Sequence, residues 1–385
     1  MSSLAKRALV LSGGGARAAY QVGALKALAQ LLPVSTPHPF PIICGTSAGA
    51  VNAAVLAAHP GTFHDAVADL ERLWSGLTPG DIYKHGWLEV AGSSLRIVLS
   101  LLNRGVGVGR PLSLLDNGPL RSLIEENIRF QQIDSNLRRG SLEAVCVTAM
   151  SYSSGESVSF FQASPGTPPW RRPRRVGRRT LLNRDHVLAS SAIPTLFPAT
   201  KLEHDYFGDG ALRQLSPLSS AIHLGAEQLF IIGVSDNRAR KARRQEKTRT
   251  RKTSPSLAQI VGHLLNSAFV DSLEEDIARM ERTNRLLASV PPGSLRDRDS
   301  AMRTIDNVVV TPSEPLDEIS ADHIHDLPRS VRTLLGSTGA TTGGGATSAS
   351  YLLFTPQFIG DLIALGLRDT LWCAGEIERL FASPS

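Results

Sequence analysis

Short apolar runs alternate with longer segments of helical spacing along the first part of the chain. Arg7–Leu11 (RALVL) and residues 41–44 (PIIC) have the composition of buried strands, and each leads into a turn rich in glycine. Residues 16–32 follow the first turn with apolar positions at helical spacing, and residues 50–58 follow the second as a helix of small side chains. Strands that alternate with helices predict an α/β fold with a mainly parallel central sheet and helices on both faces.

The pattern continues to the C-terminus with longer helical segments. Residues 256–288 and 351–381 have helical spacing, whereas residues 336–350 (GSTGATTGGGATSAS) have the composition of a linker. The remaining apolar runs predict strands at 142–150, 158–161, 206–210, 228–234 and 307–310. We divide the chain into a core over 1–235, a basic linker over 236–254, and a mostly helical C-terminal extension over 255–385 that packs on the core.

The composition is that of a globular protein, and its positive charge is concentrated in two segments. Of 385 residues, 42% are hydrophobic and 20% are charged, which excludes global disorder. Six arginines lie between Arg171 and Arg179, and the second segment, from Arg238 to Lys252, carries a net eight positive charges. Without both segments the formal charge falls from +6 to −8. Neither segment has interleaved aromatic residues, so we predict solvated loops and no nucleic-acid binding, with local anion binding by these segments as the alternative.

The cysteines and the apolar runs indicate which compartment to expect. Cys44, Cys146 and Cys373 are widely spaced and form no CxxC pair, so we predict neither a disulfide framework nor a zinc site. The apolar run at 8–11 is too short for a signal peptide, and no apolar stretch reaches the length of a membrane span. We expect a cytoplasmic protein without a signal peptide or transmembrane helix, and we leave peripheral membrane contact open.

The first turn, residues 13–18 (GGGARA), has the GxGxxA pattern of dinucleotide-binding folds. Those folds place an acidic residue about 20 positions further on, but no Asp or Glu precedes Asp65 here. A tight turn without chemistry is a second interpretation. The third is an oxyanion site, made of backbone N–H groups at the start of a helix. The candidate residues for it are Gly13, Gly14, Gly15 and Arg17, of which Arg17 either adds a cation or braces the loop.

The second turn, residues 45–49 (GTSAG), is a GxSxG pattern between an apolar strand and a helix of small residues. In this context the pattern describes a nucleophile elbow. Gly45 and Gly49 relieve the crowding of the turn and let the hydroxyl of Ser47 project from it. We therefore predict that Ser47 is a nucleophile.

A serine hydroxyl needs a base to become a nucleophile, and two arrangements are open. In a Ser-His-Asp triad, a histidine after Asp209 would act, and the candidates are His223, His263, His323 and His325. His223, however, has the position of an ordinary helix-face residue. In a Ser-Asp dyad, Asp209 itself takes the proton, and its place between two glycines at the end of an apolar strand suits this role.

In these residues the sequence resembles the patatin-like lipid acyl hydrolases. The signatures of that family are a GGGxRG turn, a GxSxG elbow, an ASxAxPxxFxP segment and an Asp-Gly pair that carries the catalytic aspartate. Here they occur in order at residues 13–18, 45–49, 189–198 (ASSAIPTLFP) and 209–211 (DGA). Ala18 and Ala211 replace glycines of the strictest pattern, and the resemblance covers residues 7–235.

The resemblance implies an α/β/α fold and a phospholipase A or lysophospholipase activity. It implies that Ser47 is the nucleophile, Asp209 the base and the turn at Gly13, Gly14 and Gly15 the oxyanion hole, with no metal and no cofactor. The substrates would be phospholipids or lysophospholipids, cleaved through an acyl-enzyme. We further expect the two basic segments to contact an anionic membrane surface. A triad esterase or thioesterase, and a non-catalytic lipid-binding protein of the same fold, remain the alternatives.

Overall fold

The computed structural model describes residues 6–34, 36, 38–102, 111–234, 272–290, 303–337 and 349–382, with the side chains of 97–102 excepted. Several sequence expectations lie outside these residues. They are the basic segment from Arg238 to Lys252, His263, the first half of the helix expected at 256–288, and most of the linker expected at 336–350.

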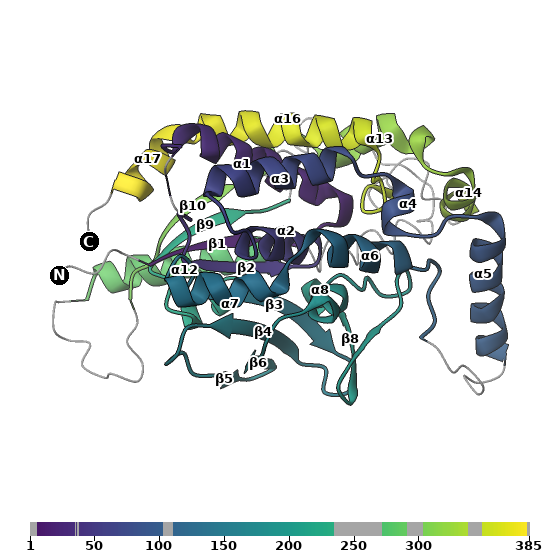
Figure 1. The fold of residues 1–385 in the computed structure, drawn as a ribbon, viewed down its shortest axis with the longest axis horizontal. Coiled ribbons are helices and arrows are strands. Elements are labelled where there is room, and N and C mark those ends of the chain that lie inside the picture. Colours follow the sequence, from purple (N-terminus) through teal and green to yellow (C-terminus); the bar gives the residue numbers. More distant parts are fainter. Residues whose placement is uncertain are drawn as a thin grey trace.

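The described strands form one sheet, in the order β10-β9-β1-β2-β3-β4-β6-β5, with β8 pairing on β3 and β7 on β8. From β10 to β3 all neighbours are parallel, whereas β4 and β8 run antiparallel to β3. The predicted α/β fold with a mainly parallel sheet is therefore confirmed (Figure 1). The strands are β1 (Arg7–Leu11), β2 (Ile42–Thr46), β3 (Ala144–Ser151), β4 (Ser157–Ala163), β5 (Trp170–Arg172), β6 (Arg175–Arg179), β7 (Thr200–Leu202), β8 (Asp205–Asp209), β9 (Gln228–Ile232) and β10 (Asp306–Val310).

Helices cover both faces of the sheet, because its parallel strands are apolar on both sides. One face packs against α1, α2, α3 and α16, and the other against α9 and α12. Figure 1 shows α1, α3 and α16 together along one side of the molecule. The helices of the first half are η1 (Gly15–Ala18), α1 (Ala19–Leu31), α2 (Ala48–Ala57), α3 (Phe63–Ser75), α4 (Pro79–Ile82), α5 (Trp87–Leu102), α6 (Gly118–Asn127), α7 (Phe130–Arg139) and α8 (Arg184–Ser190). Those of the second half are η2 (Gly210–Arg213), α9 (Ser219–His223), α12 (Ser272–Ala288), α13 (Leu316–His323), η5 (Ile324–Asp326), α14 (Arg329–Ser337), α16 (Pro356–Trp372) and α17 (Ala374–Ala382).

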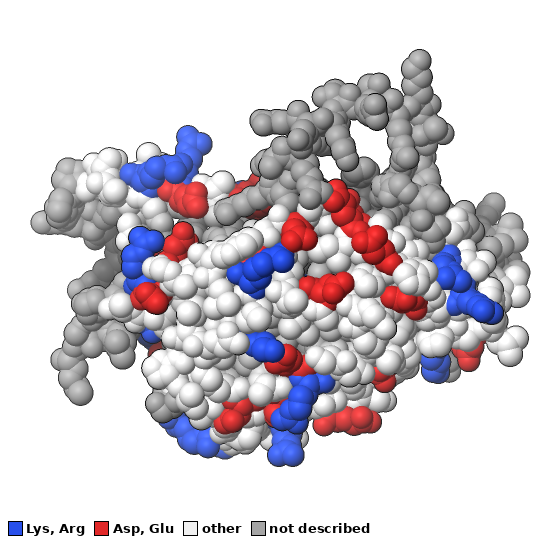
Figure 2. Space-filling view, turned by 90° about the horizontal axis from the view of Figure 1, so that it is seen from above, with Lys and Arg blue, Asp and Glu red and all other residues white. Residues whose placement is uncertain are grey.

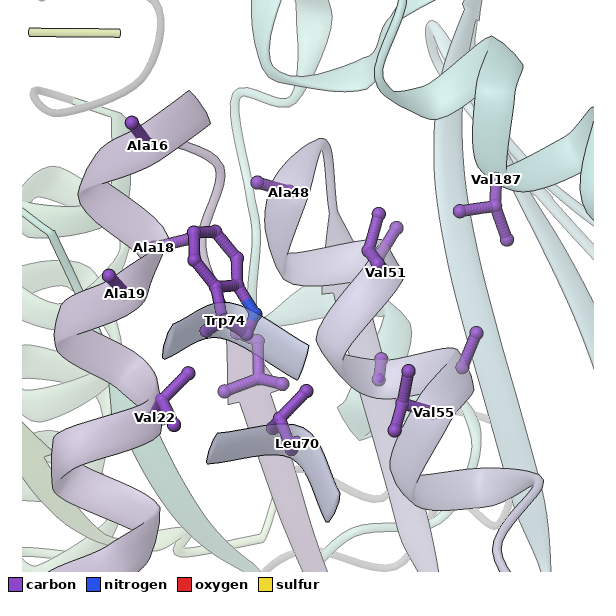
Figure 3. Close-up of a cluster of buried hydrophobic side chains, with 14 of the residues drawn as sticks. Ala16, Ala18, Ala19, Val22, Ala48, Val51, Val55, Leu70, Trp74 and Val187 are labelled. Carbon is purple, nitrogen blue, oxygen red and sulfur yellow. The ribbon is translucent and has the colours of Figure 1, made fainter. Parts of the chain in front are cut away.

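Small side chains let the elements around the first two turns pack closely. In Figure 3 the indole ring of Trp74 lies between Ala18 at the start of α1 and Ala48 at the start of α2. Its Nε1–H donates a hydrogen bond to Asn52 Oδ1 of α2 at 2.7 Å, so the polar edge of this buried ring is satisfied. The helix of small side chains that the sequence predicts therefore packs closely against its neighbours.

The C-terminal helix α16 packs directly on α1. A Cβ atom on Gly23 would lie 2.0 Å from the carbonyl oxygen of Ile363, and one on Gly366 would lie 2.1 Å from that of Tyr20. The two backbones therefore approach more closely than side chains would allow. Tyr20 also donates a hydrogen bond to Asp369 at 3.0 Å. This C-terminal helix is thus part of the packed core.

The first basic segment is not a loop, and that prediction is wrong. Trp170–Arg172 and Arg175–Arg179 are the strands of a hairpin, and β6 pairs in parallel with β4. Trp170 covers Gly177 and stacks on Phe161 with ring centres 4.9 Å apart. The many arginines made the segment resemble a loop. The strand β6 is stabilised by pairing with the edge of β4 and by the side chain of Trp170.

The start of the C-terminal helix was also predicted wrongly. Residues 351–355 are not helical, and α16 begins at Pro356, where a proline suits the first turn. The preceding residues are held in an irregular conformation by contacts with the first turn of the chain, described below. Within the described residues, no helix combines the length and the apolar character that crossing a bilayer requires.

Candidate active site

Ser47 lies in the tight turn between β2 and α2. Its backbone has φ 56° and ψ −130°, which residues with a Cβ atom rarely adopt. The chain also approaches itself closely here. A Cβ atom on Gly45 would lie 2.3 Å from the carbonyl oxygen of Gly49, and one on Gly49 would lie 2.5 Å from that of Leu11. The turn therefore has the strained geometry that the GxSxG pattern predicts.

Asp209 ends β8, and strand pairing brings it next to the serine turn. Ala149 of β3 is its register partner, while the preceding Thr148 pairs with Thr46, the residue before Ser47. The Ser47 hydroxyl donates a hydrogen bond to Asp209 Oδ2 at 2.5 Å. The structure thus brings together the two residues that the sequence proposes as nucleophile and base, across 162 positions of the chain.

The carboxyl group of Asp209 is fully buried. Burial raises its pKa from 3.8 to about 7, because the charged form loses its hydration. The hydrogen bonds from Ser47 and from the backbone N–H of Ala211, the latter at 3.0 Å, favour the charged form and limit the rise. A carboxylate with a pKa near neutrality is matched to general base catalysis at neutral pH.

Two serines of the ASSAIP segment hold the backbone of the elbow. Ser190 accepts a hydrogen bond from the N–H of Ser47 at 2.9 Å and donates one to the carbonyl oxygen of Thr148 at 2.6 Å. Ser191 donates to the carbonyl oxygen of Ser47 at 3.1 Å. Both serines are buried, so water does not compete for these bonds. Sequence reasoning marks the segment through the resemblance alone and gives neither serine a role.

The glycine turn lies beside the elbow because β1 and β2 are parallel neighbours. Gly15 has φ +55° and lines the same pocket as Ser47. A Cβ atom on Gly15 would also lie 2.3 Å from the carbonyl oxygen of Tyr351, so this position requires glycine for two reasons. The predicted part of Gly13, Gly14 and Gly15 in stabilising an oxyanion stays a prediction.

Residues 349–355, which we call the strap, lie over the glycine turn. The carbonyl oxygen of Tyr351 accepts a hydrogen bond from the backbone N–H of Ala16 at 3.1 Å. Arg17 is fully buried, and its Nε–H donates to Ser350 Oγ at 2.7 Å. Its guanidinium carbon lies 4.4 Å from the centre of the Tyr351 ring. Arg17 therefore ties the turn to the strap, which corresponds to the bracing role among the two considered from the sequence.

An apolar pocket opens beside Ser47. Its lining residues include Val51, Trp74, Ile82, Phe197, Tyr351 and Phe354. The strap thus forms one of its walls, and Phe354 stacks on Trp74 with ring centres 6.2 Å apart. The cavity has about 40 Å³, enough for about three water molecules at roughly 10–15 Å³ each. An acyl chain therefore enters only if lining side chains move.

The structure does not bring His223 to the serine. Its Nδ1 lies 2.8 Å from the carbonyl oxygen of Ser219 within α9, and its ring stacks on Trp170. His323 lies between Asp326 and Asp361 at the end of α13. The direct bond between Ser47 and Asp209 leaves no histidine between them. Among the described residues, no group of three His, Cys, Asp or Glu side chains is placed to hold a metal ion.

The strap is a part of the candidate site that the sequence does not reveal. The apolar stretch at 351–354 was assigned to a helix, because no local signal distinguishes a buried irregular segment from a buried helix. Its contact with the glycine turn joins residues more than 330 positions apart. Only the tertiary structure shows that Tyr351 and Phe354 face the pocket beside Ser47.

Comparison with known families gives one match over more than half of the chain. The model of the patatin-like phospholipase family matches residues 9–222. This range contains the glycine turn, the elbow, the ASSAIP segment and Asp209, and it ends within α9.

Two curated relatives carry the name cGAMP-activated phospholipase. One, from Escherichia coli (strain TW11681), is 29% identical over 220 residues, which are 55% of this chain and 53% of the relative. The other, from Pseudomonas aeruginosa (strain BWHPSA011 / Pa011), is 28% identical over 215 residues, which are 56% of this chain and 55% of the relative. The chain spans about half the length of the curated relatives that it matches.

The solved structures that this chain resembles have low sequence identity and low TM-scores. Human GIVD cytosolic phospholipase A2 gives a TM-score of 0.47 at 14% identity, with 98% of this chain and 60% of that chain covered. VipD from Legionella pneumophila gives a TM-score of 0.36 at 13% identity, with 97% and 68% covered.

Proposed function

The chain belongs to the patatin-like phospholipase family, and from this premise we propose that it is a serine lipid acyl hydrolase of the phospholipase A or lysophospholipase type. The observation that carries the proposal is the 2.5 Å hydrogen bond from the Ser47 hydroxyl to buried Asp209, at the mouth of an apolar pocket. It unites a nucleophile, a base and a place for an acyl chain in one site.

In the first step, Ser47 Oγ attacks the ester carbonyl carbon while Asp209 Oδ2 takes the hydroxyl proton. The carbonyl oxygen becomes an oxyanion, which the N–H groups of the Gly13 to Gly15 turn would stabilise. When this intermediate collapses, the bond to the alcohol oxygen breaks and the alcohol leaves with the proton held by Asp209. The acyl chain stays as an ester on Ser47, within the apolar pocket.

In the second step, water attacks the acyl-enzyme and Asp209 takes a proton from it. Collapse of the second oxyanion returns that proton to Ser47 Oγ and releases the fatty acid. The pKa of Asp209 near 7 supports this cycle, because the carboxylate must accept a proton and give it back at each step. The direct Ser47–Asp209 bond favours this dyad over a Ser-His-Asp triad.

We propose that the enzyme acts on lipid at a membrane or micelle surface, with α5 as the contact. Trp87, Leu88 and Leu95 on α5 are 58%, 88% and 59% exposed. Figure 1 shows α5 standing at one end of the molecule, away from the sheet. Ile82, shortly before α5, lines the apolar pocket. Exposed tryptophan and leucine side chains close to a lipid pocket suit insertion at a membrane interface.

The decisive experiment compares wild type with Ser47→Ala on diacyl, lyso and thioester substrates of matched chain length. The proposal expects ester hydrolysis and fluorophosphonate labelling in wild type, and loss of both in the variant. Equal labelling of the two proteins would exclude Ser47 as the nucleophile. Hydrolysis of none of the substrates would favour a non-catalytic lipid-binding protein. Because two relatives are named cGAMP-activated, each assay is run with and without cGAMP.

A double variant of α5 and a control variant together test the membrane contact. Trp87→Ala/Leu88→Ala should lower hydrolysis of vesicle lipid several-fold and leave hydrolysis of a soluble short-chain ester unchanged. Leu181→Ala, which removes a side chain that is 73% exposed elsewhere on the surface, serves as control. An equal loss on both substrates would contradict a role of α5 in docking.

A further inference from the structure

The arginines of the β5–β6 hairpin differ in what they contact. Arg171 pairs with Glu156 at 2.9 Å, Arg178 lies 3.8 Å from Glu203, and Arg179 donates to backbone carbonyl oxygens. Arg172 and Arg175 pair with no carboxylate in the part of the chain that the structure describes. They are also register partners across the hairpin, so two like charges lie side by side. Such a pair is destabilising unless an anion compensates it.

Arg172 and Arg175 line a large pocket on the face of the sheet that α9 and α12 cover. The pocket has about 550 Å³, within the roughly 300–1,000 Å³ of small-molecule sites. Two further arginines enter it, Arg279 from α12 and Arg303 from the segment before β10. Arg303 is fixed by hydrogen bonds to the carbonyl oxygens of Ile222 at 3.2 Å and Ala226 at 2.9 Å. Four arginines from three separate segments therefore line one cavity.

The negative charge that lines this pocket does not balance the arginines. Asp276 is the single carboxylate among the described lining residues. It is buried, accepts a hydrogen bond from the backbone N–H of Leu218 at 3.0 Å, and lies 3.8 Å from Arg279. Burial also raises its pKa, which favours the uncharged form. The excess is three positive charges with Asp276 ionised and four with it neutral, since each guanidinium stays protonated.

His223 also lines the pocket. Burial lowers the pKa of His223, and the charges of Arg172 and Arg175 lower it further. On the face shown in Figure 2, the described Lys and Arg side chains are interspersed with Asp and Glu.

We propose that this cavity, which we call the arginine pocket, is a binding site for a ligand that carries a phosphate group and an apolar or aromatic portion. Guanidinium groups recognise phosphate oxygens with paired hydrogen bonds. Leu218, Ile222, Met280 and Ile305 also line the pocket and provide apolar surface for the rest of the ligand. A nucleotide and a phospholipid headgroup share this chemistry, and the experiment below distinguishes them.

Binding is measured by calorimetry on the full chain carrying Ser47→Ala, so that no lipid is hydrolysed. The probes are pyrophosphate, guanosine monophosphate, and vesicles of phosphatidylglycerol against vesicles of phosphatidylcholine. Arg172→Gln/Arg175→Gln should raise the Kd about 100-fold, since loss of one charged hydrogen bond weakens binding about tenfold. Arg279→Gln, on the exposed side of α12, should raise the Kd about tenfold. This single variant replaces the double variant in the test if the double variant fails to fold.

The matched control is Arg171→Gln/Arg178→Gln, which removes two charges from the same hairpin but outside the pocket. It should change the Kd by less than about threefold, because neither side chain lines the pocket and each already lies against a carboxylate, Glu156 or Glu203. An equal loss in the control and the pocket variant would overturn the proposal, as would failure of every probe to bind at millimolar concentration. Pocket-dependent binding of the soluble probes supports a soluble phosphate ligand, whereas pocket-dependent binding of phosphatidylglycerol vesicles alone supports a lipid headgroup.

Discussion

The pocket at Ser47 and the arginine pocket lie on opposite faces of one sheet and differ in almost every physical property. The first is apolar and has about 40 Å³, and Ser47 in its wall is bonded to the buried carboxylate of Asp209. The second has about 550 Å³ and is lined by four arginines that reach solvent. Alternate side chains of β1 and β2 contribute to the two hydrophobic cores, so successive residues of a strand pack toward opposite faces of the sheet.

The contrast shows how burial decides what a charged group can do. Asp209 loses its hydration, and its pKa rises to the range in which it can exchange a proton. The arginines keep their charge in the wider pocket and can only attract and orient an anion. In the functions proposed above, the closed site is therefore the reactive one and the open site serves recognition.

The largest expected effect comes from Asp209→Asn. The amide keeps the shape of the carboxylate but cannot take the proton of Ser47, so kcat should fall by about 10³-fold. Pyrophosphate binding to the arginine pocket should stay unchanged, which a titration of the same preparation measures. A variant that retains more than a tenth of wild-type turnover would contradict the base role of Asp209.

The next largest effect is expected in the pH dependence of wild-type activity. The carboxylate of Asp209 must be ionised to act, so kcat/KM should rise through a pKa of about 7 and level off above it. At pH 5 the rate should be about 100-fold below the plateau, since each unit below the pKa costs about tenfold. A short-chain soluble ester avoids effects of pH on the lipid phase. A profile that is flat between pH 5 and 8 would exclude Asp209 as the titrating base.

The sequence predicts the closed site well because its parts are local. The positive φ of Ser47 and the close approach of Gly45 to Gly49 both lie within five consecutive residues, and such a turn leaves a readable pattern. Asp209 also follows from its position between two glycines at a strand end. Their meeting at 2.5 Å depends on strand order, which an α/β pattern restricts but does not determine.

The open site and the strap could not be predicted, because their stability comes from distant partners. Trp170 and Phe161 make a hairpin of a segment whose composition is that of a loop. Arg303 joins the arginine pocket from the segment before β10, and no pattern links it to Arg172. Arg17 contacts Ser350 across 333 positions, so its bracing role required the structure.

Asp209→Asn should be more stable than wild type, although it is less active. The native carboxyl has a raised pKa, so the native state holds more protons than the unfolded state between pH 3.8 and about 7. Wild type therefore loses stability as the pH rises through this window, whereas the amide does not titrate. The variant should gain up to about 4 kcal/mol in free energy of unfolding at pH 8, since one pKa unit corresponds to about 1.4 kcal/mol, and less at pH 5, in urea titrations. A less stable variant at pH 8 would show that the buried charge is compensated.

The smallest expected effect on activity comes from replacing one buried serine on each face of the sheet. Ser190 accepts the N–H of Ser47 at 2.9 Å, whereas Ser220 in α9 contacts Ser159 at 2.8 Å on the face of the arginine pocket. Each substitution by alanine removes one buried hydroxyl, so both should lower stability by about 1 kcal/mol. Only Ser190→Ala releases the elbow, and it should lower kcat about tenfold, because small displacements of a nucleophile are costly. Steady-state kinetics on one soluble ester measure both variants. An equal fall in kcat for Ser220→Ala would mean that the two faces of the sheet are coupled, and the division between reactive and recognising regions would fail.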